Sequence, residues 1–264
     1  MVIADRPSGA RHAEWSTQSD VAYRFDWGPN GLRALAPISD VVVIVDVLRF
    51  TSAVSAAVDR GSTVFPYRWA DDGAPEYAAE RDATLAGRRE SGEISLSPTD
   101  LLALRSPLRL VLPSPNGSAL SFAARDHGAT HVLAGCLRNA SATARLARTL
   151  AGPSGTIAII AAGERWHGAT GPIRPAVEDL LGAGSILAAL DPSAATSGPC
   201  CSPEAAAARA AFVGARPRLH ETIASCASGR ELIARGWADD VTTCAALDAT
   251  DHAAQLVDDA YVRA

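Results

Sequence analysis

The chain has 264 residues and a mass of 27.3 kDa, which is long enough to bury a large hydrophobic core. Its composition, 48% hydrophobic and 20% charged, is that of a folded globular protein and excludes a disordered chain. The net charge of −5 argues against a nucleic acid partner. All 24 basic residues are arginine, which excludes mechanisms that use a Schiff-base lysine or a phosphate-loop lysine.

Cysteine usage and the N-terminal sequence favour a cytoplasmic protein. The five cysteines form no CxxC pair and no cysteine/histidine metal spacing, and their odd number argues against a disulfide-stapled fold. The N-terminus lacks the basic and apolar regions of a signal peptide, and no apolar run approaches the ~20 residues that cross a bilayer. We expect no membrane contact, and a homodimer is the expected assembly.

Hydrophobic patterning predicts an α/β fold. Residues 1–18 are polar and expected to be loose. Two short strands are expected at 21–26 and 32–35 around an Asn-Gly turn. Further strands are predicted at 41–47, 63–65, 108–112, 130–134 and 156–162, with Pro66 ending the second of these. Helices are predicted at 51–59, 72–86, about 118–124, 140–150, 176–190 and 203–213, and 87–99 is a loop. Residues 216–262 are expected to be mostly helical, without a strong strand.

Alternating strands and helices indicate βαβ units. We therefore predict one domain over 19–264. It is a three-layer α/β/α fold with a mainly parallel sheet in a core at 19–191. A helical C-terminal elaboration follows at 192–264.

The first candidate site lies at the end of the predicted strand VVVIVDV. Its continuous Val and Ile residues are typical of a strand buried on both faces, and Asp46 falls near its carboxyl end. Open α/β sheets bind ligands at that edge. Arg49 follows three residues later, so a carboxylate and a guanidinium are available together. The alternative is an aspartate that ends a strand and pairs with a local arginine, and the local pattern leaves both open.

Two more strand-to-helix junctions carry polar residues of a similar kind. Helix N-termini present unpaired N–H groups that hold phosphate or another anion, although the same residues are ordinary helix caps. Three such junctions at one sheet edge, two of them with an arginine, favour an anion site. The candidate substrate-binding residues at the second and third junctions are Ser114, Asn116, Gly117 and Ser118, and Arg138 and Asn139.

The fourth junction contains Arg165, a further candidate for substrate binding, and then Glu178 and Asp179 near the start of a helix. Adjacent carboxylates satisfy the helix dipole, which is the structural alternative. They also supply the hard oxygen ligands that Mg²⁺ prefers, and Asp46 could complete the site. A metal bridging a phosphate beside arginines fits phosphoryl transfer to water.

Other enzyme classes are disfavoured by missing motifs. The chain has no GxxxxGK[ST], no GxGxxG after a strand and no GxSxG. Cys136 lacks the loop of cysteine phosphatases and is better explained as a packed thiol. Asp46-Val47-Leu48 has leucine where the haloacid-dehalogenase phosphatases carry a second aspartate, which removes the general acid of that mechanism.

Several ordered motifs resemble the 2-phosphosulfolactate phosphatase family. VVVIVDVLRFTSAV resembles its DVLRATT segment, SPNGS its TTNGT, GCLRNASA its GSxLNAxA, and AAGERW…RPAVEDLLGAGSI its AGxxG…xxEDxLxAGxI. SGRELIARGWADDV resembles its C-terminal SGRxLxxxGxxxDV, so the blocks span roughly 20–250. The resemblance implies Mg²⁺-dependent hydrolases that remove phosphate from (R)-2-phospho-3-sulfolactate, a step towards coenzyme M. The positions that match its motifs are Asp46, Arg49, Asn116, Gly117, Asn139, Glu178, Asp179, Ser228, Gly229 and Arg230, with Arg230 expected to reach a sulfonate or phosphate.

The chain departs from the family pattern at 87–99, where its glycine- and acid-rich block is shortened, and at Ser114-Pro115 and Arg138. The leading hypothesis is a Mg²⁺-dependent phosphatase for a small acidic phosphoester. In this hypothesis, Asp46, Glu178 and Asp179 bind the metal and a metal-activated water is the nucleophile. Arg49 contacts the anion as part of the catalytic set. The alternatives are a non-catalytic anion-binding homologue and an aspartyl-phosphate phosphatase with Asp46 as the nucleophile.

Overall fold

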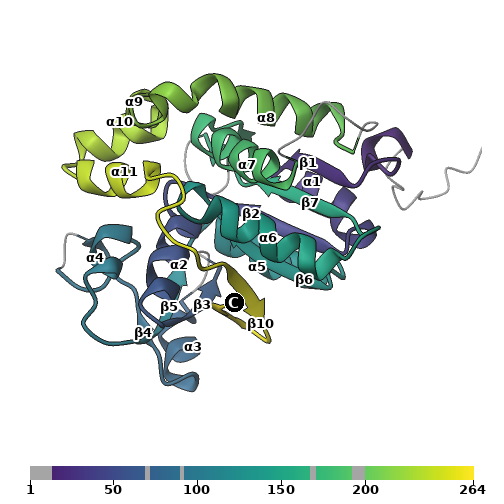
Figure 1. Ribbon diagram of the computed structural model, residues 1–264. Helices are drawn as coiled ribbons and strands as arrows, with labels where there is room; N and C mark the ends of the chain where they lie inside the picture. Colours follow the sequence, from purple (N-terminus) through teal and green to yellow (C-terminus); the bar gives the residue numbers. More distant parts are fainter. Residues whose placement is uncertain (1–13, 69–71, 90–91, 167–170, 192–199) are drawn as a thin grey trace, which may run out of the picture.

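The computed structural model describes residues 14–68, 72–89, 92–166, 171–191 and 200–264. Its centre is a nine-stranded sheet (Figure 1). In spatial order the strands are β1 (Tyr23–Trp27), β7 (Ile157–Ala161), β2 (Val41–Val45), β6 (His131–Gly135), β10 (Ala254–Val257), β11 (Ala260–Arg263), β3 (Thr63–Tyr67), β5 (Arg109–Pro113) and β4 (Thr84–Leu85). The first four are mutually parallel, and so are the last three. The prediction of a mainly parallel sheet is therefore confirmed.

Helices cover both faces of this sheet, which confirms the three-layer prediction. The α-helices of the described residues are α1 (Gly28–Leu35), α2 (Phe50–Asp59), α3 (Ala74–Glu80), α4 (Pro98–Leu102), α5 (Gly117–Asp126), α6 (Ala140–Ala151), α7 (Val177–Leu190), α8 (Pro203–Ala215), α9 (Leu219–Ser225), α10 (Ala227–Ala234) and α11 (Ala238–Ala245). Strand β2 is fully buried. Its Val41, Val43 and Val45 share a core with α6, α7 and α8, and its Val42 and Ile44 share another with α1 and α5. Successive side chains of a strand point to opposite faces, so an unbroken apolar run serves both layers.

The predicted strand at 32–35 is wrong, because this segment belongs to helix α1. Pro29 stands in the first turn of α1, where its missing N–H costs nothing, and Leu32 and Leu35 are both fully buried. A helix therefore satisfies the same apolar residues as a strand would. The predicted helix at 72–86 is also shorter than expected, since only Ala74–Glu80 is helical and β4 follows.

Pro66 does not end its strand, as the sequence led us to expect, but lies inside β3. Thr63 donates its N–H to Leu108 O on the β5 side. The backbone nitrogen of Pro66, three residues on, therefore points to the opposite side, towards β11. Strand β11 pairs with β3 only at Val64, so the missing N–H of Pro66 removes no ladder bond.

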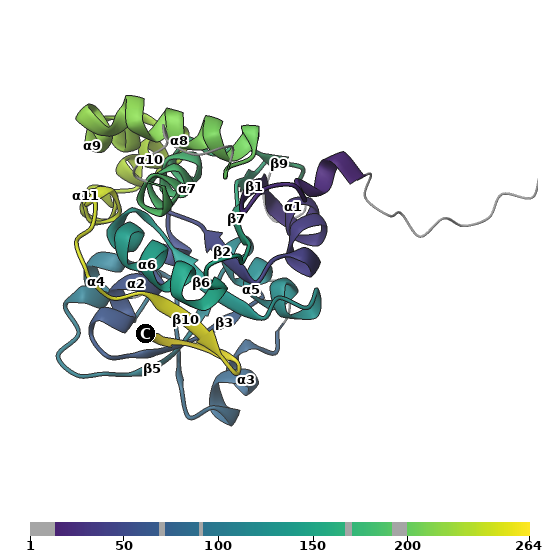
Figure 2. The ribbon, with the colours of Figure 1, turned by 45° about the vertical axis from the view of Figure 1, so that its right-hand side comes forward.

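The prediction that 216–262 lacks a strand is wrong at its end. Strands β10 and β11 form an antiparallel hairpin that lies between β6 and β3 and so joins the two parallel blocks (Figures 1 and 2). Asp258 has a φ of +54° in the turn. Tyr261 of β11 is fully buried, and its hydroxyl lies 2.7 Å from Ser121 Oγ. Helices α8 to α11 do form the expected helical elaboration above the sheet (Figure 2).

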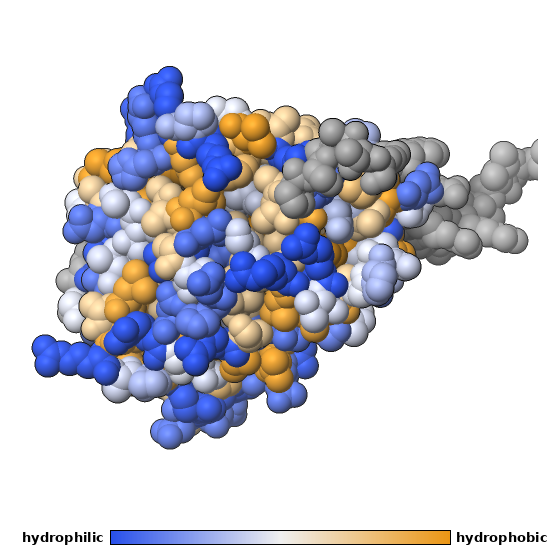
Figure 3. All heavy atoms as spheres, in the orientation of Figure 1, coloured by the Kyte–Doolittle hydropathy of each residue, from blue (hydrophilic) through white to orange (hydrophobic). Residues whose placement is uncertain are grey.

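Most of the predicted loose N-terminus, 1–18, lies outside the described residues, and Glu14–Thr17 form a short 3-10 helix. Among the described residues, no helix is long and apolar enough to cross a membrane. Hydrophobic residues on the face in Figure 3 are scattered among hydrophilic ones. The homodimer, the single domain and the cytoplasmic location stay predictions.

Candidate active site

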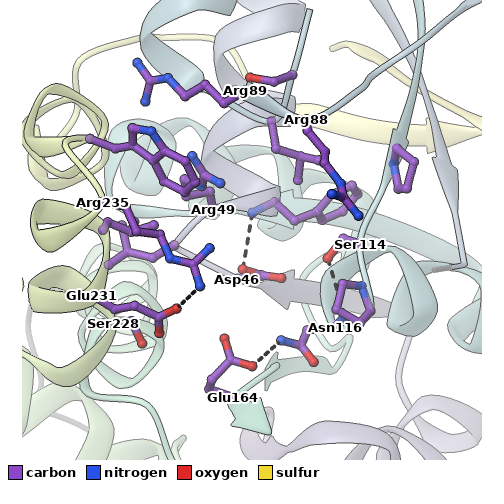
Figure 4. A pocket seen from close by; sticks show the side chains of 18 of the residues that line it. Asp46, Arg49, Arg88, Arg89, Ser114, Asn116, Glu164, Ser228, Glu231 and Arg235 are labelled. Atoms are coloured by element: carbon purple, nitrogen blue, oxygen red, sulfur yellow. Dashed lines mark hydrogen bonds and ion pairs between the residues drawn. The ribbon is translucent and has the colours of Figure 1, made fainter. Parts of the chain in front are cut away.

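A pocket of about 620 Å³ opens where β2, β5 and β7 end (Figure 4). This volume is in the range of small-molecule sites. Its lining combines carboxylates, arginines and amide or hydroxyl groups, which are Asp46, Glu164 and Glu231, Arg49, Arg88, Arg89 and Arg235, and Ser95, Ser114, Asn116 and Ser228. The remaining lining residues are mostly apolar or glycine and include Phe50 and Trp237. The pocket can therefore hold a small ligand with several charges.

Asp46 lies at the base of this pocket, directly after β2, and is only 6% exposed. Its Oδ1 accepts the Phe50 N–H at 3.2 Å, and its Oδ2 accepts the Gly117 N–H at 2.9 Å. The first and second predicted junctions therefore meet at this carboxylate. Burial is the main cause that raises the pKa of Asp46 to about 6, the two backbone N–H groups lower it, and the nearby carboxylates of Glu164 and Glu178 add to the rise.

Gly117 leaves room for the Asp46 carboxylate because it has no side chain. A Cβ at this position would overlap the Phe50 ring and lie 2.8 Å from Asp46 Oδ2. We expect Gly117→Ala to displace the Asp46 carboxylate, to lower activity by about tenfold or more, and to cost roughly 1–3 kcal/mol of stability. Gly214→Ala is the matched control, because a Cβ there meets nothing within 4 Å. Steady-state kinetics and urea unfolding measure both, and equal behaviour of the two variants would contradict the expectation.

Asn116 and Ser114 also line the pocket, beside Glu164. The Asn116 amide Nδ2 donates to Glu164 Oε1 at 3.1 Å, and the Asn116 N–H donates to Ser114 Oγ at 3.3 Å (Figure 4). Glu164 belongs to the short strand β8 (Glu164–Arg165), which follows β7. Ser118 has a structural contact, since its buried hydroxyl donates to Leu112 O at 2.9 Å. The carboxylates at this strand-end side of the pocket are thus Asp46 and Glu164, the second of which the sequence did not single out.

Glu178 and Asp179 begin α7 behind the pocket and are each 3% exposed. Asp179 Oδ1 accepts the Val47 N–H at 2.7 Å and its Oδ2 accepts the Gly163 N–H at 2.9 Å, so this carboxylate ties the ends of β2 and β7 together. Burial raises the pKa of Asp179, and so do the carboxylates of Asp46 and Glu178. Glu178 Oε2 accepts a hydrogen bond from Cys226 Sγ at 3.2 Å. Among the described residues, Asp46, Glu178 and Asp179 do not form a trio with all ligand atoms within 4.8 Å.

The other predicted substrate-binding residues lie outside the pocket lining. Arg138 is buried and pairs with Asp59 at 3.5 Å, and Asn139 Oδ1 accepts the Cys136 N–H at 2.9 Å as a cap. The segment after α11 crosses this junction, where Thr250 N–H donates to Arg138 O at 3.1 Å. The third junction is therefore covered by backbone rather than open to a ligand.

Arg165 and Arg230 also lie outside the lining. Arg165 donates to Gly171 O at 2.9 Å, and Arg230 is exposed on α10. Cys136 is fully buried and burial raises the pKa of its thiol, as the packed-thiol interpretation requires.

The second side of the pocket is an arginine cluster, which we define as Arg49, Arg89 and Arg235 around the Trp237 ring. Their guanidinium carbons lie 4.6, 5.8 and 5.5 Å from the ring centroid, respectively. Beneath them Asp240 is fully buried, and its Oδ2 accepts hydrogen bonds from Arg49 at 2.8 Å and from Arg89 at 2.5 Å. Its Oδ1 accepts one from Ser97 Oγ at 2.6 Å. Sequence reasoning gave Asp240 no role, and the only signal was its place within the SGRELIARGWADDV block.

Comparison with known proteins gives the family. The protein-family model described as 2-phosphosulpholactate phosphatase matches residues 30–259 of the chain. The chain belongs to the 2-phosphosulfolactate phosphatase family. A protein of Methanothermobacter thermautotrophicus named 2-phosphosulfolactate phosphatase is 30% identical over 210 residues, which cover 78% of this chain and 82% of that relative. One of Thermus thermophilus, named probable 2-phosphosulfolactate phosphatase, is 32% identical over 154 residues, or 56% and 60% of the two chains. The prediction of a phosphoric monoester hydrolase of this family is confirmed.

Proposed function

We propose that the chain is a Mg²⁺-dependent phosphatase that hydrolyses 2-phosphosulfolactate or a closely related 2-phospho acid. The observation that carries this proposal is the pocket itself. Asp46 and Glu164 stand on one side, and arginines stand on the other (Figure 4). The phosphoryl group of a phosphorylated acid would bind at the metal, and its other acid groups would pair with the arginines. The names of the two relatives give the substrate class.

The residues present fit Mg²⁺, which takes one or two carboxylates, several waters and phosphate oxygens. Asp46 and Glu164 both line the pocket, and the carboxylates of Glu164 and Glu178 raise the pKa of Asp46, but among the described residues these three do not have all ligand atoms within 4.8 Å of one another. Among the described residues, no arginine lies within ion-pair distance of these three carboxylates, so their negative charge has no cationic partner there. Asp46 and Glu164 would hold the metal, with Glu178 behind them. Asp179 is left out of the metal site, because it ties the ends of β2 and β7 together and does not line the pocket, whereas Asp46 does.

The chain's own residues position the phosphoester. Mg²⁺ held at Asp46 and Glu164 would neutralise charge on the phosphoryl oxygens and would lower the pKa of a water that serves as the nucleophile. Asn116 orients Glu164 through its amide, and the N–H groups of Phe50 and Gly117 fix both oxygens of Asp46. Arg49, which follows Asp46 by three residues and lines the pocket, would contact the phosphoryl group. In the reaction, the oxygen of a water forms a new bond to phosphorus and the ester bond between phosphorus and the substrate oxygen breaks. The products are inorganic phosphate and the alcohol, whose oxygen takes the proton that the water gives up.

Phosphate release from a panel of esters tests this function. We expect turnover of 2-phosphosulfolactate with Mg²⁺, and none after EDTA treatment until Mg²⁺ is restored. Thermal stabilisation by the same esters without phosphate release would instead favour the non-catalytic homologue. An Asp46 nucleophile would be revealed by a trifluoroberyllate adduct on this carboxylate in the Mg²⁺-loaded protein.

The raised pKa of Asp46 predicts the pH dependence of stability. Because it titrates near 6 when folded and near 3.8 when unfolded, the folded state binds more protons between these values. The free energy of unfolding therefore falls as pH rises through this window, by on the order of 3 kcal/mol for this group. Asp179, whose pKa is also raised, acts in the same direction.

Urea unfolding in EDTA measures the effect, with Asp46→Asn as the reference that cannot titrate. From about pH 4.5 to about pH 7 the variant should gain stability relative to the wild type. Parallel pH curves for the two proteins would contradict the expectation. Activity should rise with pH through about 6, because the ionised carboxylate is the form that binds metal.

A further inference from the structure

We infer that Arg89 and Arg235 of the arginine cluster bind the sulfonate at the tail of the substrate, which is not transferred, and that Asp240 positions Arg89. This inference rests on the proposed function and names the part of the pocket that selects the substrate's tail. The ligand chemistry is a sulfonate or other strong acid group on the carbon next to the phosphorylated one.

Positive and negative side chains occupy separate parts of the pocket. In Figure 4, Arg89 and Arg235 lie above and to the left of Asp46, whereas Glu164 and Asn116 lie below it. The carboxylate side would hold the metal and the phosphoryl group. A sulfonate in the same pocket then needs cations at a separate place, and Arg89 and Arg235 supply them. Its planar guanidinium groups match the oxygens of a sulfonate or carboxylate.

The positive charge of the arginine cluster is only partly neutralised by neighbouring carboxylates. Arg49 and Arg89 share a single oxygen of Asp240, so two guanidinium groups face one buried carboxylate. Arg89 also lies 3.6 Å from Asp100, but the side chain of Asp100 is 52% exposed and this pair is screened by water. Arg235 pairs with the exposed Glu231 at 2.6 Å. An arriving acid group therefore meets cations that the protein has not fully neutralised.

The guanidinium groups of the arginine cluster are held in place before a ligand binds. Asp240 has no solvent exposure, and the Ser97 hydroxyl fixes its second oxygen. The Trp237 ring stacks near all three guanidinium groups, which restricts their rotamers. Binding then costs little further ordering of long side chains. Asp240 does not reach the pocket lining and acts only through Arg49 and Arg89, so it is a positioning residue.

The test compares two esters that differ only in the tail. 2-Phosphosulfolactate carries a sulfonate on C3, and 2-phospholactate carries hydrogen there instead. We expect the wild type to prefer the first, and Arg89→Ala to reduce the ratio of the two kcat/KM values by about tenfold to a hundredfold, as expected for one charge-assisted hydrogen bond. Arg218→Ala is the matched control, because Arg218 is exposed, pairs with Glu221 and does not line the pocket. This variant should leave the ratio of the two kcat/KM values unchanged.

Asp240→Asn should lower the same ratio through a higher KM for the sulfonated ester, a split that a merely structural role would not produce. Arg235→Ala, on the exposed rim, gives a second variant if Arg89→Ala folds poorly. An Arg89→Ala protein that loses activity equally on both esters would overturn the inference, because Arg89 would then serve the shared phosphate or carboxylate. A wild type with no preference between the esters would overturn it as well, while leaving the phosphatase function intact.

If the wild type releases phosphate from neither ester, the proposed function fails, and binding still decides the inference. Sulfolactate, which has no phosphate, should then raise the Tm of the wild type and raise that of Arg89→Ala by clearly less. Equal shifts for the two proteins would count against the subsite.

Discussion

Asp46→Asn is expected to lower the rate of phosphate release by about a thousandfold or more. The amide keeps the size of the side chain but removes the charge at the centre of the carboxylate side. In phosphoryl transfer, charge placed beside the transferring group provides most of the catalysis. In either orientation, the amide would also turn its NH2 donor towards the N–H of Phe50 or of Gly117, which in the wild type donate to the two carboxylate oxygens.

Initial rates at saturating Mg²⁺ measure this effect, with Asp126→Asn as the control. Asp126 is an exposed carboxylate that pairs with Arg68 on the surface, and its change to asparagine should leave turnover within about twofold of the wild type. An Asp46→Asn protein that retains a tenth of the wild-type rate would rule out a central role for this carboxylate.

Asp240→Ala should give the largest loss of stability, on the order of 3 kcal/mol. The change leaves two guanidinium groups and the Ser97 hydroxyl without their shared buried acceptor. The cost is at the lower end for a buried ion pair, because the arginine side chains are 17% and 19% exposed and water can reach them.

The neighbouring Asp239 provides the control for this prediction. It stands on the same first turn of α11 but is exposed, so Asp239→Ala should cost less than about 1 kcal/mol. Urea denaturation of both variants gives the comparison. If the two substitutions cost the same, Asp240 does not anchor the arginine cluster.

The sequence was most informative where one local pattern had one physical solution. Five β-formers in a row can only be buried on both faces, so β2 and the position of Asp46 at its end followed from the pattern. The encounter of Asp46 with Gly117 followed in outline, because ligand sites gather at strand ends. The strand at 32–35 failed because Leu32 and Leu35 satisfy a helix as well as a strand.

The sequence was least informative about which strand ends stay open. Ser114, Asn116 and Asn139 all follow strands, and capping and anion binding use the same residue types. Only the covering of Arg138 by the segment around Thr250 separates them, and that contact joins residues more than a hundred positions apart. The ion pair of Arg49 with Asp240 spans 191 positions, beyond any local periodicity. Two four-residue strands, β10 and β11, are likewise too short for their alternation to stand out.

A crystal structure of the protein soaked with Mg²⁺ and phosphate would show which carboxylates bind the metal. We expect a metal at about 2.0–2.1 Å from oxygens of Asp46 and Glu164, with phosphate bound between it and Arg49. A metal bound away from Asp46, or phosphate held at the covered third junction beside Arg138 and Asn139, would contradict this expectation.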